Sequence, residues 1–142
     1  MIRMSGLAVL SLLFLGIAPS ANATIINFVA DLSGPNESPP NASPGTGFAD
    51  IHFDTVANTM HVQVSFSGLL GMTTASHIHC CTALPGAGTA GVATVTPTFT
   101  GFPLGVTNGT YDHTFDMTLL SSYNPVFVTA NGGTAASAEA VL

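Results

Sequence analysis

Basic side chains are almost absent from this chain. Of its 142 residues, one is Lys or Arg, seven are Asp or Glu and five are His, which gives a formal net charge of −6 at pH 7. The single basic residue is Arg3. Nucleic-acid binding needs several Lys or Arg side chains to neutralise phosphates, and a polybasic membrane patch needs them as well. The sequence therefore excludes nucleic acid as a partner and excludes electrostatic attachment to an anionic membrane.

Charged residues of either sign are also scarce. They make up 6% of the chain, whereas about a quarter is usual in soluble domains. Tryptophan is absent and cysteine occurs twice. Hydrophobic residues reach 46%, which is enough to exclude disorder caused by low hydrophobicity. The length fits a single folded domain.

Residues 1–23 have the pattern of a secretory signal peptide. Arg3 provides the positive start, an apolar run covers 7–18, and Ala-Asn-Ala at 21–23 is a small-x-small cleavage site. The apolar run is too short to span a bilayer. We therefore expect a short N-terminal signal helix, no transmembrane span in the mature chain 24–142, and a secreted, periplasmic or cell-surface location.

The mature part alternates β-like runs with turns rich in Gly, Pro and Asn. Period-two or continuous apolar patterns predict strands, and they occur at 25–32, 47–54, 60–67 and 111–118, with weaker candidates at 74–80 and 92–100. Four prolines between residues 33 and 46 predict a loop, and 135–142 has a helix-forming composition. These patterns predict an all-β, antiparallel, sandwich-like single domain.

Three segments carry a resemblance to a known family. They are FVADLSGPNESPP at 28–40, FSGL at 66–69 and ASHIH at 75–79. In this order and spacing they resemble the CHRD (chordin) domain family from residue 26 to the end of the chain, in the form of an exported bacterial-type member. The resemblance implies a mostly-β extracellular domain with no established enzymatic activity, of the kind that in animals occurs in a secreted binder of bone morphogenetic proteins.

The chain departs from the family pattern in two places. Cys80 and Cys81 stand where family members usually have a Gly-Pro turn after His-Ile-His. The sequence also ends at Leu142, before the last two strands of the family pattern. We therefore expect the domain at 24–142 to be a C-terminally incomplete copy or fragment. A gene product with no function of its own is the extreme form of this hypothesis.

His77 and His79 are the main candidate metal ligands. Residues two apart in a strand point to the same face, and imidazole suits both Zn²⁺ and Cu²⁺. Cys80, Cys81 and His113 are further candidates for the same site. The His-x-His pattern is similar to that of copper–zinc superoxide dismutase, which is another β-sandwich, so redox activity belongs to this alternative. The competing interpretation is that both imidazoles hydrogen-bond backbone groups or face solvent.

Export leaves several states open for the two cysteines. An oxidising compartment favours a disulfide, and adjacent cysteines can close only a small strained ring. A vicinal disulfide, an intermolecular bridge, free thiols and metal ligation are the alternatives.

The remaining polar residues match no catalytic pattern. Acidic side chains alternate along 50–54 and 112–116, which indicates solvated strand faces rather than a Ca²⁺ loop. The chain has no Gly-x-Ser-x-Gly elbow and no P-loop lysine. The sequence predicts a non-enzymatic, exported CHRD-domain protein that binds an extracellular protein, a surface polymer or a metal ion. The alternative is a Cu/Zn metalloprotein centred on His77 and His79.

Overall fold

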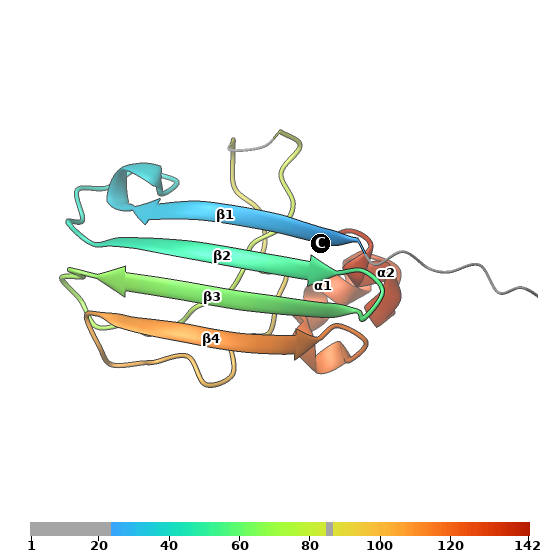
Figure 1. Ribbon diagram of the computed structural model, residues 1–142. Helices are drawn as coiled ribbons and strands as arrows, with labels where there is room; N and C mark the ends of the chain where they lie inside the picture. The colour runs from blue at the N-terminus through green and yellow to red at the C-terminus, as the bar shows by residue number, and fades with distance from the viewer. Residues whose placement is uncertain (1–23, 85–86) are drawn as a thin grey trace, which may run out of the picture.

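The four strands of the sheet coincide with the predicted strand runs at 25–32, 47–54, 60–67 and 111–118. The structure is a computed structural model that describes residues 24–84 and 87–142, so the predicted signal peptide at 1–23 lies outside the described residues. Four antiparallel strands lie side by side in chain order (Figure 1). They are β1 (Ile25–Ser33), β2 (Thr46–Asp54), β3 (Thr59–Ser67) and β4 (Gly109–Asp116).

The two faces of the sheet differ because the strands alternate in sequence. Phe53, Met60 and Phe115 pair across β2, β3 and β4 and are all buried. Residues at the other parity point to the opposite, open face. Five of the seven acidic side chains lie on that open face: Asp31, Asp50, Asp54, Asp112 and Asp116.

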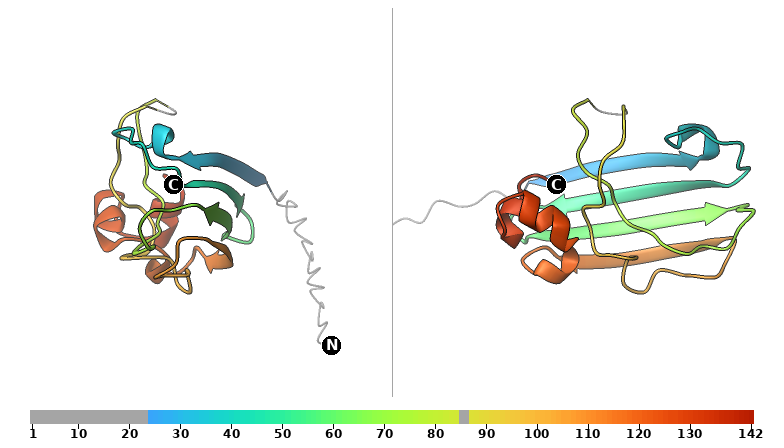
Figure 2. Two further views of the ribbon diagram at one scale, coloured as in Figure 1. Left: turned by 90° about the vertical axis from the view of Figure 1, so that its left-hand side faces the viewer. Right: turned by 180° about the vertical axis from the view of Figure 1, so that it is seen from behind.

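The layer that covers the core face is mostly extended coil. The segments 68–84 and 87–108, which lie between β3 and β4 in the chain, cross the core face of the sheet (Figure 2). They make two isolated bridges, His79 with Val92 and Thr94 with Tyr123. The antiparallel all-β single domain is confirmed, and the candidate strands at 74–80 and 92–100 form this coil layer.

Side-chain hydroxyls explain why the coil layer forms no regular ladder. The Ser76 amide donates to Oγ1 of Thr98 at 2.9 Å, and the Ile78 amide donates to Oγ1 of Thr94 at 2.8 Å. A hydroxyl that accepts a backbone N–H takes the place of a strand carbonyl. Pro97 also interrupts a strand ladder, because proline has no N–H to donate.

Short helices close one end of the sheet (Figure 1). After β4 come η2 (Leu120–Ser122), α1 (Pro125–Ala130) and α2 (Ala135–Glu139), whereas η1 (Gly34–Asn36) follows β1. No helix in the described part of the chain is long and apolar enough to cross a membrane. The core lies between the sheet and these covering segments: Phe53, Met60, Val62, Ala93, Phe99, Tyr111, Phe115, Met117, Tyr123, Phe127, Val128 and Ala138.

The segments that cover the core do not extend over β1. Ile26 and Phe28 are on its core-facing side, yet 43% and 48% of their surfaces are exposed. On the open side Val29 is exposed as well. β1 is also an edge strand of the sheet. The core therefore sits over β2, β3 and β4, and a concave surface remains beside the end of β1.

Candidate functional site: a groove beside a histidine pair

A groove lies on the core side of the sheet, between the end of β1 and the segment 73–79. We call it the histidine groove, and its volume is about 510 Å³. We call its apolar lining the floor, which consists of Leu32, Val64, Phe66, Leu69 and Phe102. We call its polar lining the rim, which consists of Ser33, Asn41, Ser43, Thr46, Thr73 and Ser76, together with Glu37, His77 and His79. Apolar pockets with a few convergent polar groups are the usual form of ligand sites.

His77 and His79 both line this groove, as their spacing predicts. Ile78, between them, turns the other way and packs against the core. Its carbonyl accepts from the Ala93 amide at 2.9 Å, and its amide donates to Thr94. The backbone is thus anchored on the core side, which holds the two imidazoles on the groove side.

Backbone carbonyls fix the tautomer of each imidazole. Nδ1 of His77 lies 3.2 Å from the Pro97 oxygen, and Nδ1 of His79 lies 2.7 Å from the Ala90 oxygen. A carbonyl oxygen only accepts hydrogen bonds, so each Nδ1 carries the hydrogen. In the neutral ring the lone pair is therefore on Nε2. The two ring centres are 4.9 Å apart.

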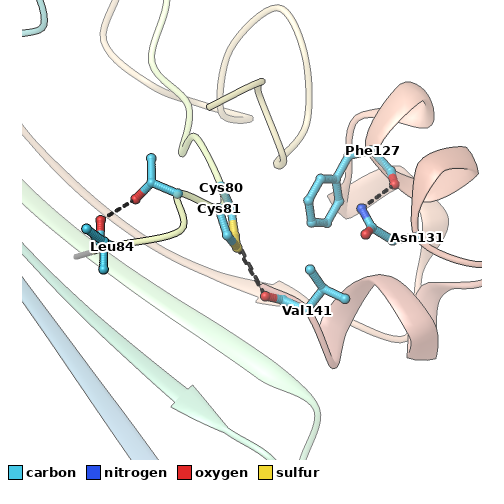
Figure 3. The surroundings of a disulfide bond; sticks show 7 residues. Cys80, Cys81, Leu84, Phe127, Asn131 and Val141 are labelled. Carbon is cyan, nitrogen blue, oxygen red and sulfur yellow. Dashed lines mark hydrogen bonds between the residues drawn. A yellow bond between two sulfur atoms is a disulfide. The ribbon is translucent and has the colours of Figure 1, made fainter. Parts of the chain in front are cut away.

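The two cysteines do not join the histidine pair as thiolates. Cys80 and Cys81 are linked to one another by a disulfide. Figure 3 shows their sulfur atoms turned toward the carbonyl of Val141, just beyond α2. The sulfur–oxygen distances are 3.7 Å for Cys80 and 3.2 Å for Cys81. Disulfide sulfurs carry no hydrogen, so these are packing contacts between the coil layer and the end of the chain.

His113 is also separate from the pair. It lies on the core side of β4, with its ring 6.0 Å from the Tyr111 ring and 4.6 Å from the Phe115 ring. Across residues 24–84 and 87–142, no three His, Cys, Asp or Glu side chains form a group that could hold a metal ion. The described residues thus supply a two-imidazole pair rather than a complete protein ligand set.

A second histidine pair lies on the open face of the sheet. His52 and His61 face each other across β2 and β3, with ring centres 6.2 Å apart. His52 contacts Oδ1 of Asn27 through Nδ1 and Oδ1 of Asp50 through Nε2, at 2.6 Å and 3.1 Å. His61 Nε2 lies 2.8 Å from Oδ1 of Asp112. Both imidazoles are thus engaged with neighbouring side chains.

Hydrogen bonds also lower the pKa of three carboxylates on the open face. Those from His61 and Gln63 lower the pKa of Asp112 below its ordinary value. At the turn after β2, backbone amides lower the pKa of Asp54, and Thr118 does the same for Asp116. Each of these three carboxylates therefore accepts hydrogen bonds from nearby groups of the fold.

The charge of the histidine groove comes from a single acidic residue. Glu37 is the one Asp or Glu among the lining residues, and no Lys or Arg occurs in the chain after Arg3. Among the hydrogen bonds of the described residues, neither groove imidazole contacts a hydroxyl, a thiol or a carboxylate. The groove has a neutral to weakly anionic character.

Fold and groove together define an all-β domain with one antiparallel sheet, a coil cover and a ligand-sized groove between them. The sequence matches the CHRD domain family over residues 28–139, which is most of the chain. The chain belongs to the CHRD domain family, whose domains are typically extracellular or exported. No curated protein and no solved structure matches the chain.

Proposed function

We propose that this chain is an exported, non-enzymatic CHRD-domain protein that binds an extracellular ligand in the histidine groove. The observation that carries the proposal is the groove itself, with an apolar floor, a polar rim and two oriented imidazoles. Membership of the CHRD family supports an extracellular setting, and the signal-peptide pattern at 1–23 supports export.

The surroundings of His77 and His79 support a binding role rather than catalysis. A nucleophile–base pair needs the base within hydrogen-bond reach of a hydroxyl or thiol, with a third group to orient the base. In the described part of the chain, the imidazoles are instead oriented by backbone carbonyls of Pro97 and Ala90. Such rings present an acceptor to a ligand and have no nucleophile to activate.

The lining of the groove narrows the class of ligand. Leu32, Phe66 and Phe102 offer apolar contact, and the rim offers hydroxyl, amide and imidazole groups. Glu37 disfavours a negatively charged ligand at this site, and the described residues contain no Lys or Arg that could compensate for it. The fitting ligand is neutral or cationic and has an apolar part, as in an exposed protein segment or an uncharged surface polymer.

Amide NMR on the ¹⁵N-labelled chain tests this proposal with three probes that share one alkyl chain. They are octyl glucoside, octyltrimethylammonium and octyl sulfate, each below its micelle concentration and in the presence of EDTA. We expect the neutral and cationic probes to shift the amides of Asn41, Thr73 and Ser76. The anionic probe should bind more weakly.

Two tryptophan variants supply the matched comparison. Ala75 is exposed and lines the groove, whereas Ala57 is exposed in the turn between β2 and β3. Ala75→Trp should fill the groove and abolish the shifts, and Ala57→Trp should leave them unchanged. Shifts scattered over the sheet, or retained in Ala75→Trp, would contradict a ligand site in this groove.

Export has its own measurement. Expression in a Gram-negative host, followed by cell fractionation, should give the protein outside the cytoplasm. Its measured mass should match a chain that begins at Thr24. A cytoplasmic product that still begins at Met1 would remove the extracellular part of the proposal.

A further inference from the structure

The ring centres of the two groove imidazoles have a separation that allows both rings to bind one metal ion. An ion about 2.0–2.1 Å from each imidazole nitrogen lies about 3.2 Å from each ring centre, so ligand angles between square and tetrahedral place the ring centres about 4.5–5.2 Å apart. The ring centres of His77 and His79 are 4.9 Å apart. The separation therefore falls inside the interval that a shared ion requires.

The hydrogen bonds of the pair point to the same use. Metal-binding histidines commonly donate the other ring N–H to a carbonyl or carboxylate, which fixes the tautomer and the orientation of the ring. The Pro97 and Ala90 carbonyls have this role for His77 and His79. Each ring thus keeps an Nε2 lone pair for an electrophile, before any metal is present.

The open-face pair shows what an unsuitable arrangement looks like in the same molecule. The rings of His52 and His61 are 6.2 Å apart, outside the interval for a shared ion. Their nitrogens also contact Asp50 and Asp112. The ring-centre separation and the carboxylate contacts therefore distinguish the open-face pair from the groove pair.

We propose that Nε2 of His77 and Nε2 of His79 bind one Cu²⁺ or Zn²⁺ ion at the rim of the histidine groove. Imidazole nitrogen suits both ions, and Cu²⁺ is the tighter of the two at a given site. Among the described residues, no third His, Cys, Asp or Glu completes a group with the pair that could hold a metal ion. The remaining positions of the ion are filled by water or by donor atoms of a groove ligand, as at open zinc sites.

This inference deepens the proposed function, since it uses the same groove, but it can be tested without any organic ligand. The metal-free full chain is titrated with Cu²⁺ and, separately, with Zn²⁺ by isothermal calorimetry. We expect one ion per chain and a higher affinity for Cu²⁺. His77→Ala and His79→Ala should each weaken binding by more than about tenfold, since losing a ligand costs at least as much as losing its outer-shell partner.

His61→Ala is the matched control, because it removes an imidazole from the open-face pair and leaves the groove intact. It should bind Cu²⁺ as the parent chain does. Circular dichroism confirms that each variant is folded. For a variant that fails to fold, a second measurement on the parent chain applies: substoichiometric Cu²⁺ should broaden the amide signals of 77–79 before those of 52 and 61.

The absence of stoichiometric binding of either ion would overturn the metal site, as would Cu²⁺ binding that persists in the His77→Ala/His79→Ala double variant. Broadening centred on the open face would do the same. The amphiphile titrations in EDTA are independent of these outcomes, so failure of the metal site and failure of the groove as a ligand site are distinguishable.

Discussion

Thr94 links the histidine pair to the protein core, and replacing it with valine is the most informative single change. Its side chain is fully buried, and its hydroxyl oxygen accepts from the Ile78 amide at 2.8 Å. Valine keeps the shape but has no acceptor. The Ile78 N–H, located between His77 and His79, then loses its partner.

The expected cost follows from the burial of that contact. A donor left without a partner in the interior costs about 1–3 kcal/mol, so Thr94→Val should lower the free energy of unfolding by about that amount. Urea denaturation followed by circular dichroism measures it. Amide hydrogen exchange should show faster exchange at Ile78 in Thr94→Val. In Thr94→Ser the hydroxyl remains, so the Ile78 amide should stay protected.

Thr98 provides a matched comparison in the same coil layer. Its hydroxyl accepts from the Ser76 amide at 2.9 Å, but both residues are only half-buried. Thr98→Val should therefore cost less, because water can replace the lost acceptor. The reasoning fails if Thr94→Val is as stable as the parent chain, or if the Ile78 amide exchanges equally slowly in the valine and serine variants.

Four further substitutions, one of them a control, test the core and the open face. Met60→Ala should cost about 2–5 kcal/mol because the side chain is fully buried, whereas Met72→Ala, at a residue 68% exposed, should stay within about 0.5 kcal/mol of the parent chain in urea denaturation. Tyr123→Phe should cost about 1–3 kcal/mol, since the buried hydroxyl donates to the Met117 carbonyl at 2.9 Å; a cost near zero would contradict that hydrogen bond. The lowered pKa of Asp112 gives stability that is present above the ordinary carboxyl pKa and is lost as pH falls through the folded value. Asp112→Asn should therefore be less stable than the parent at pH 7 in thermal unfolding, and the difference should shrink as pH falls through the folded pKa of Asp112. A difference that does not change with pH would be inconsistent with this linkage.

Three of the four strands were predictable because period-two alternation is a local property, and β1 was predictable from its mostly apolar run. Met60, Val62 and Val64 alternate with polar residues in the sequence. In β3 the side chains of Met60 and Val62 are buried in the core. A six-residue helix, α1, was missed although a signal exists. Asn124 caps it by accepting from the Val126 amide at 3.0 Å, and Pro125 occupies its first turn.

The coil layer and the groove depend on contacts that no local pattern contains. The amide of Ile78 is taken by a hydroxyl sixteen residues later in the chain, so the run at 74–80 resembles a strand without forming one. The spacing of His77 and His79 predicts a shared direction and the structure has it. Their tautomers depend on the carbonyls of Ala90 and Pro97, which only the tertiary fold brings near.

The concentration of carboxylates on the open face has a consequence for how copies of this protein behave in solution. Without Lys or Arg after residue 3, repulsion between molecules at neutral pH comes from carboxylates alone. The isoelectric point of the sequence is about 4.8, so the net charge of the chain approaches zero in acidic surroundings. At such a pH, little charge repulsion prevents the exposed apolar side chains of β1 in different molecules from making contact. The colloidal stability of the domain therefore depends on the acidity of its surroundings.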